Sequence, residues 1–189
     1  MRFLSWSGVL VLGGGAGRVG PVPSGGSDPV DGGVGGDAEH VGEDGGGDSS
    51  TIEVSDGLEV VLRPVVPEDK KLLEEGFERL SPESRYRRFF SPVPRLSEAL
   101  LSYLTDLDYH DHFAWAALVR ENGRDALAGV SRYGRLPEHP GSAEMAVTVI
   151  DPYQHRGIGT LLLDALVLRA IGAGISQLEG HVLAENRPM

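Results

Sequence analysis

The stretch AEMAVTVIDPYQHRGIGTLL, residues 143–162, decides the fold. Its first eight residues are almost all apolar, which is typical of a strand buried on both faces. Asp151-Pro152 ends that strand, and a short polar loop follows. From Gly157 onward the chain is apolar again over fifteen residues, which is helical length. We therefore predict a buried strand, a tight loop and a helix.

The loop has the composition of an anion-binding turn. Gly157 and Gly159 remove side chains where backbone amides would have to approach a ligand. The first amides of a helix lack internal partners, and the helix dipole is positive there. Arg156 adds a full positive charge. These features predict a phosphate or pyrophosphate cradle, and the alternative is a glycine-softened turn without a ligand.

Strand and helix patterns alternate on both sides of this stretch. Pro67 suits the first turn of a helix, and the acidic residues after it favour the positive end. We expect strands over residues 58–63, 113–119, 126–133, 143–150 and 175–182, a hairpin turn at residues 121–124, and helices over residues 67–80, 97–103 and 157–171. This order predicts an α/β (α+β) fold, a mixed central sheet flanked by helices.

The first 57 residues differ from the rest in composition. They hold 17 of the 27 glycines and a net charge of −7 out of −11. Such a segment buries too little apolar surface to offset its ordering entropy, so we expect a disordered Gly/Asp-rich tail over residues 1–57. Its apolar start is a weak signal-peptide core or a non-native start. A Gly-x-Gly-x-x-Gly match at residues 15–20 lacks the helix of a dinucleotide site and is interpreted as coincidence.

Several segments resemble one superfamily. Gln154-His155-Arg156-Gly157-Ile158-Gly159 is similar to the Gln/Arg-x-x-Gly-x-Gly/Ala acetyl-CoA signature of the GNAT N-acetyltransferases, the acyl-CoA N-acyltransferase fold. The wider sequence resembles the acetyltransferase domain of bacterial protein lysine acetyltransferases. The further matching segments are Leu62-Arg63-Pro64, LSPESRYRRFF at residues 80–90, AEMAV at residues 143–147 and AENRPM at residues 184–189. The resemblance covers residues 58–189, which we interpret as the GNAT domain.

The resemblance implies acetyl-CoA as co-substrate and assigns its contacts. The pyrophosphate would lie on the loop, the pantetheine arm would run along the preceding strand, and Asn186 would approach that arm. A helix-cap or turn role is the alternative for Asn186. The expected cofactor-binding residues are Val147, Thr148, Val149, Gln154, His155, Arg156, Gly157, Ile158, Gly159, Thr160 and Asn186.

Glu144 is the candidate general base. It is the only charged residue in an apolar strand, where burial would raise its pKa. A lysine acceptor has a pKa of ~10.4 and must lose a proton before it attacks, so a base is needed. The resemblance points to the same glutamate. The alternatives are a solvated strand edge or an ion pair with Arg132 across the sheet.

Two other clusters have simpler explanations than a site. Residues 106–112 hold Asp and His residues without the spacing of a helix-borne metal site, so we expect a polar loop and no metal. Arg85, Arg87 and Arg88 could meet a cofactor phosphate or an acidic partner. Such a run more often faces solvent while its neighbouring aromatic residues are buried.

The sequence thus predicts transfer of an acetyl group from acetyl-CoA to a primary amine, with a protein lysine as the expected acceptor. The absence of cysteine excludes a cysteinyl intermediate and fits a cytoplasmic protein. The near-balanced charge of residues 58–189 argues against a nucleic-acid partner, and no apolar run is long enough for a membrane span. Relative to the superfamily the chain looks incomplete at its C-terminus. The alternative is therefore a truncated, non-catalytic CoA-binding domain, and a metal-dependent hydrolase is a distant third.

Overall fold

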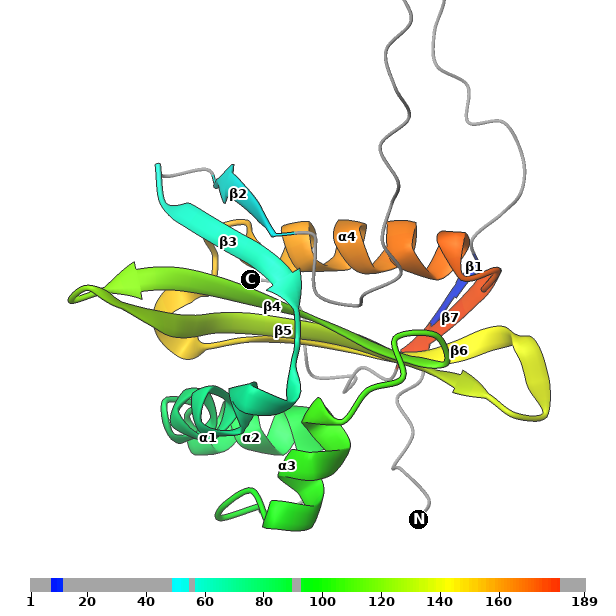
Figure 1. Cartoon of the computed structure of the whole chain (residues 1–189), viewed down its shortest axis with the longest axis horizontal. Helices are drawn as coiled ribbons and strands as arrows, with labels where there is room; N and C mark the ends of the chain where they lie inside the picture. Colours follow the sequence, from blue (N-terminus) through cyan, green and yellow to red (C-terminus); the bar gives the residue numbers. More distant parts are fainter. Residues whose placement is uncertain (1–7, 12–48, 55–56, 90–92, 181–189) are drawn as a thin grey trace, which may run out of the picture.

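A computed structural model describes residues 8–11, 49–54, 57–89 and 93–180. In these residues a seven-stranded sheet is covered by helices on both faces (Figure 1). The strands are β1 Gly8–Val11, β2 Ser50–Glu53, β3 Glu59–Pro64, β4 His112–Glu121, β5 Arg124–Leu136, β6 His139–Val149 and β7 Gln177–Gly180. The helices are α1 Lys70–Glu78, α2 Pro82–Phe89, α3 Glu98–Thr105 and α4 Ile158–Gly172, with 3-10 turns η1 Pro67–Asp69 and η2 Asp151–Tyr153.

The sheet has the order β1-β7-β6-β5-β4-β3-β2 and is antiparallel except between β6 and β7. These two strands are parallel, and α4 is the crossover between them. Helices α1–α3 lie on one face and α4 lies on the other (Figure 1). The mixed sheet between helices confirms the predicted fold class.

Among the described residues, the pairing of β6 with β7 covers three residue pairs. It runs from Ser142 opposite Gln177 to Glu144 opposite Glu179, whereas β6 continues to Val149 and stays paired with β5 throughout. In the described part of the chain, the β7-facing edge of β6 is therefore unpaired beyond Glu144. The candidate site is built along this edge of β6.

Two strands lie within the expected N-terminal tail. β1 pairs antiparallel with β7, and β2 pairs with β3, where Ile52 lies opposite Val60 and packs on the core. These strands lie upstream of the boundary expected at Leu58, and the division of the chain at residue 57 stays a prediction. β2 has a single large apolar residue, because an edge strand needs little burial once its backbone is paired. The Gly-x-Gly-x-x-Gly match lies outside the described residues.

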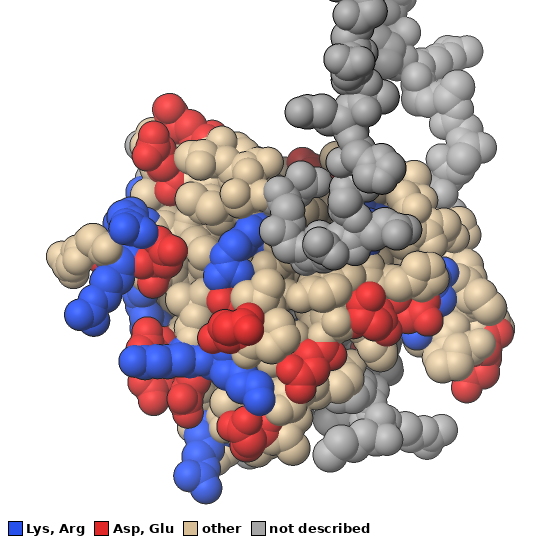
Figure 2. Space-filling view, in the orientation of Figure 1, with Lys and Arg blue, Asp and Glu red and all other residues tan. Residues whose placement is uncertain are grey.

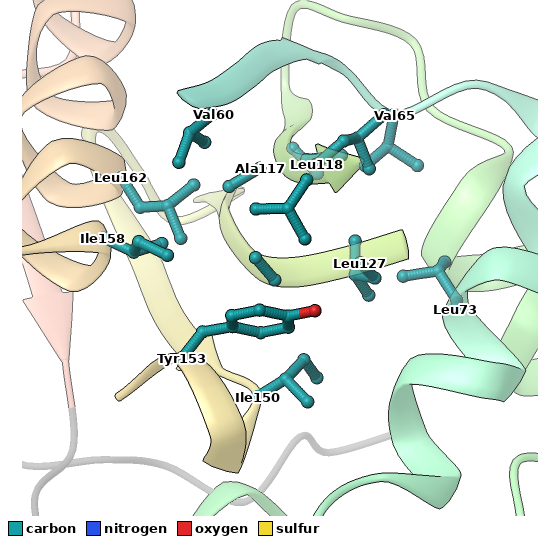
Figure 3. Close-up of a cluster of buried hydrophobic side chains, with 14 of the residues drawn as sticks. Val60, Val65, Leu73, Ala117, Leu118, Leu127, Ile150, Tyr153, Ile158 and Leu162 are labelled. Carbon is teal, nitrogen blue, oxygen red and sulfur yellow. The ribbon is translucent and has the colours of Figure 1, made fainter. Parts of the chain in front are cut away.

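The core fills both faces of the sheet. On one face, α4 buries Ile158 and Leu162 toward Ala117 of β4 (Figure 3). On the other face, α1 packs Leu73 toward Leu127 (Figure 3). Gly76 permits this close approach, because a Cβ there would lie 2.7 Å from the Leu127 side chain. The helical spacing predicted from the sequence thus gives the buried faces of both helices.

Local signals placed most elements to within a few residues. The Ser97 side chain accepts a hydrogen bond from Leu100 N (3.2 Å) and caps α3, as predicted. Asn122 and Gly123 both have positive φ and form the predicted hairpin turn between β4 and β5. None of the described helices is long and apolar enough to cross a membrane. On the face seen in Figure 2, basic and acidic side chains are interspersed.

The Arg63–Asp69 pair ties β3 to the start of α1. Asp69 is buried, accepts two hydrogen bonds of 2.7 Å from the guanidinium and a third from Val66 N (2.9 Å). We expect Asp69→Asn to lower the free energy of unfolding by about 2 kcal/mol, because a partly buried guanidinium loses its anionic partner. Urea denaturation measures this. Glu98→Gln removes the exposed Lys70–Glu98 pair (2.8 Å) and should change the free energy of unfolding little. Equal losses of unfolding free energy in the two variants would contradict the stabilising role of the Arg63–Asp69 pair.

Candidate active site

Among the described residues, the main-chain groups on the β7-facing edge of β6 have no strand partner beyond Glu144. Val149 O accepts from Gln154 Nε2 (3.1 Å) on this edge, whereas Ile150 N donates toward β5 (2.9 Å). In an antiparallel pair, the N–H and C=O groups of alternate residues point to the same edge. Met145 and Val147 therefore direct their main-chain groups to the open edge together with Val149. An extended ligand with amide groups can pair there as a further strand would.

The loop after β6 has a strained, open backbone. His155 and Gly157 have φ values of 62° and 85°, with Arg156 between them. Alternation of left- and right-handed residues turns successive amides toward one side and forms a concave anion site. Gly157 adopts this conformation without strain, whereas the backbone of His155 is strained by it. The loop conformation supports the phosphate cradle that the sequence predicts.

The first turn of α4 completes the cradle. The first main-chain bond of the helix is donated by Leu161 N to Gly157 O (3.0 Å). The amides before it have no acceptor within the helix, and the helix dipole makes this end positive. Gly159 is partly exposed, and a Cβ there would meet only Val149 Cγ2, at 3.5 Å. The amides that can bind an anion are those of Ile158, Gly159 and Thr160.

Asp151 holds the loop in place. One carboxylate oxygen accepts from Gln154 Nε2 (3.0 Å), and the other accepts from Ser81 N at the start of α2 (2.9 Å). The next anchor is Tyr153, whose hydroxyl donates to Glu121 and accepts from Arg79 (3.2 Å). The sequence analysis missed both anchors, because their partners come from distant parts of the chain. Gln154 is thus a structural residue of the loop in addition to any ligand contact.

Glu144 lies where this edge of β6 begins. It is partly buried and is the last β6 residue paired with β7. Burial raises its pKa above the ordinary glutamate value, the charge of Arg88 opposes this rise, and the like charge of Glu179 adds to it. The expected alternative of an ion pair with Arg132 is absent from the described residues, and Arg132 lies opposite Ala146. The raised pKa makes this carboxylate a stronger proton acceptor than an ordinary exposed glutamate.

The predicted site residues fall into three places. The loop and helix start gather His155, Arg156, Gly157, Ile158, Gly159 and Thr160 around one cradle, with Gln154 bonded beside it. Val147 and Val149 face the open edge with their main chain, whereas the Thr148 side chain lines a pocket on the α1–α3 face. Asn186 lies outside the described residues.

Comparisons with known proteins show the family of this chain. Residues 74–189 match the model of the Acetyltransferase (GNAT) family. The chain belongs to the GNAT acetyltransferase family. Members of this family are acyltransferases that use acetyl-CoA as acetyl donor and bind an amine acceptor.

This GNAT chain is also similar to individual members of the family. It is 37% identical to Acetyltransferase PA5475 of Pseudomonas aeruginosa over 76% of both chains. It is 38% identical to Acetyltransferase Pat of Mycolicibacterium smegmatis over 73% of this chain, but spans only 40% of that protein. Among solved structures, the GNAT domain of S. lividans PAT shares 31% identity and a TM-score of 0.67, over 73% of this chain and 80% of that one.

The Asp/His cluster at residues 106–112 has a structural role in this GNAT chain. Asp108 Oδ1 accepts main-chain bonds from three following residues and shapes the loop before β4. Asp111 pairs with Arg135 (2.7 Å). No group of three or more possible metal ligands occurs among the described residues. The polar-loop interpretation explains these side chains without a ligand.

The arginine run on α2 departs from the expected pattern. Arg85 stacks on Phe77 (4.4 Å) and donates to the end of α1 at Leu80 O (3.0 Å). Tyr86 is exposed rather than buried, and no residue of α2 is fully buried. Arg88 lines the pocket beside β6 instead of facing solvent.

The acid limb of the pH–rate profile should report the surroundings of Glu144. A base must be unprotonated, so kcat/KM falls as pH drops through its pKa. Glu179→Gln removes a like charge, lowers that pKa and should move the limb to lower pH. Arg88→Met removes an opposite charge and should move the limb to higher pH. Shifts in the same direction, measured with acetyl-CoA and a fixed amine, would contradict this assignment.

Proposed function

We propose that the chain transfers an acetyl group from acetyl-CoA to a primary amine, and that the acceptor is a lysine side chain of a protein. The observation that carries the proposal is the arrangement along β6. A candidate base lies at one end of the unpaired edge, and an anion cradle lies at the other. The lysine acceptor rests on the identity with Acetyltransferase Pat and on the resemblance to bacterial lysine acetyltransferases.

The side chains suggest direct transfer in one ternary complex. Bound acetyl-CoA supplies an acetyl group activated as a thioester. Glu144 takes the proton of the acceptor ammonium or its attacking amine, and the amine nitrogen bonds to the acetyl carbon. The carbon–sulfur bond breaks with its electron pair on sulfur. The chain has no cysteine, which excludes an acetyl-cysteinyl step.

The open edge and the cradle would orient the donor for this attack. Main-chain groups of Val147 and Val149 lie beside the expected pantetheine path, and the amides of Ile158–Thr160 face the expected pyrophosphate. An amide on the open edge could also polarise the thioester carbonyl and stabilise the oxyanion that develops there.

Amine-dependent release of CoA thiol from acetyl-CoA tests the proposal. The acceptors are a lysine-containing peptide and the same peptide with its lysine replaced by norleucine, which keeps the carbon chain and lacks the amine. We expect thiol release and one added acetyl mass only with the lysine peptide. CoA binding without turnover on any amine would favour a non-catalytic CoA-binding domain instead.

A further inference from the structure

A pocket on the α1–α3 face of the sheet lies beside the candidate base. Apolar side chains from all three helices form most of its wall, and Ala146 and Thr148 of β6 form part of its floor. Glu144 lies two residues before Ala146, so its side chain is on the same face of β6. Two cations enter this apolar pocket, Arg88 from α2 and Arg132 from β5.

Arg132 is buried without a carboxylate partner. Only 8% of the residue is exposed, and among the described residues no carboxylate lies within ion-pair distance of it. Its guanidinium lies over the ring of Tyr103, 5.0 Å from the centroid. Burial lowers the pKa of Arg132. A buried guanidinium costs much free energy unless an anion accompanies it.

Arg88 shares the pocket and is also short of negative charge. Its guanidinium lies over the Phe89 ring at 5.0 Å, and part of its surface is open to the pocket. Burial, and then the like charge of Arg132, lower the pKa of Arg88 to about 10, although Glu144 opposes this. The described lining of the pocket holds these two cations and no carboxylate. A guanidinium pair of this kind is suited to binding a carboxylate in a bidentate way.

We propose that Arg88 and Arg132 bind a carboxylate of the substrate, carried either by the transferred acyl group or by the amine acceptor. This inference rests on the proposed function, since it assigns a specificity pocket to the same site. The transfer itself is unchanged: the amine nitrogen bonds to the acyl carbon, the thioester carbon–sulfur bond breaks, and Glu144 takes the proton. The substrate class is then a carboxylate-bearing acyl thioester or a carboxylate-bearing amine.

Two matched pairs of substrates separate the sources of the carboxylate. The acyl arm compares succinyl-CoA with butyryl-CoA, and its amine acceptor carries no carboxylate. The acceptor arm compares Nα-acetyl-lysine with its methylamide, using acetyl-CoA. We expect the charged member to have a kcat/KM about 10-fold higher or more in one arm, as for a hydrogen bond between charged groups. The arm that shows the preference identifies the source.

Arginine variants test whether the two guanidiniums cause the preference. Arg132→Met and Arg88→Met should each bring the ratio close to one, and Arg132→Lys should retain only part of it. Arg120→Met, which removes an exposed arginine paired with Asp125 (2.6 Å), should leave the ratio unchanged. Melting curves identify any variant that does not fold. If Arg132→Met does not fold, Arg88→Met still tests the proposal, because Arg88 is partly exposed.

Calorimetric binding of the same four compounds separates this inference from the proposed function. If no amine is acetylated, the proposed function fails, but tighter binding of the charged compound by wild type and not by Arg132→Met still supports the carboxylate pocket. If the chain is active and neither arm shows a preference in rate or binding, the pocket assignment is wrong. A preference that both methionine variants retain also overturns it.

Discussion

Gly159→Glu is expected to weaken CoA binding by about 100-fold, which corresponds to ~2.7 kcal/mol. The new carboxylate would lie in the first turn of α4, beside the amides proposed for the pyrophosphate, and would repel a phosphate. The fold should not suffer, because a Cβ at Gly159 meets only Val149 at 3.5 Å and an acidic side chain favours a helix start. Calorimetric titration with CoA measures the affinity, and thermal unfolding checks the fold.

The matched control is Gly172→Glu at the other end of α4. A Cβ at Gly172 meets nothing within 4 Å, and the substitution changes the net charge of the chain equally. We expect near wild-type CoA affinity for this variant. Equal loss of affinity in both variants would mean that overall charge, and not the cradle, governs binding.

Glu144→Gln is expected to lower kcat by ~10²–10⁴-fold at neutral pH, the usual contribution of a general base. The KM for acetyl-CoA should change little, because the cradle lies at the far end of the open β6 edge. The deficit should shrink as pH approaches the lysine pKa of ~10.4, where the acceptor loses its proton unaided. Initial rates across pH with a saturating lysine peptide measure both effects.

Glu138→Gln is the control for this experiment, since Glu138 is exposed in the turn between β5 and β6. It should keep the wild-type rate and profile. A Glu144→Gln variant with full activity and an unchanged acid limb would remove Glu144 from the mechanism. A uniform deficit at every pH would indicate a positioning role instead of proton transfer.

Much of the fold follows from local sequence signals. The stretch from β6 to α4 combines a strand pattern, a proline stop and a glycine-marked helix start within twenty residues. The local sequence pattern therefore predicts both elements. β2 was missed for the converse reason. Its one large apolar side chain, Ile52, gives little pattern, and its order comes from pairing with β3.

The site was predictable only where its parts are adjacent in the chain. The loop signature named the residues around Gly157, and an isolated charge in an apolar strand singled out Glu144. Arg88 and Arg132 line one pocket because of the tertiary arrangement of α2 and β5, which no local pattern encodes. A signal was nevertheless present, because Arg132 is the one charged residue in the strand predicted over residues 126–133.

The register between β6 and β7 was likewise not predictable from the sequence. The strand patterns predict both elements, but the end of their pairing at Glu144 opposite Glu179 depends on where the crossover helix delivers β7. That register decides which main-chain groups remain unpaired. It therefore had to come from the structure.

Titration of CoA into labelled protein, followed by amide proton–nitrogen chemical shifts, tests the central claim most directly. That claim is that CoA lies along the open edge of β6 with its pyrophosphate on the start of α4. The account predicts that the largest shifts occur at Ile158, Gly159 and Thr160 and at Val147 on the edge. Shifts concentrated on α3 or on the hairpin at Asn122, with the α4 amides unchanged, would contradict it.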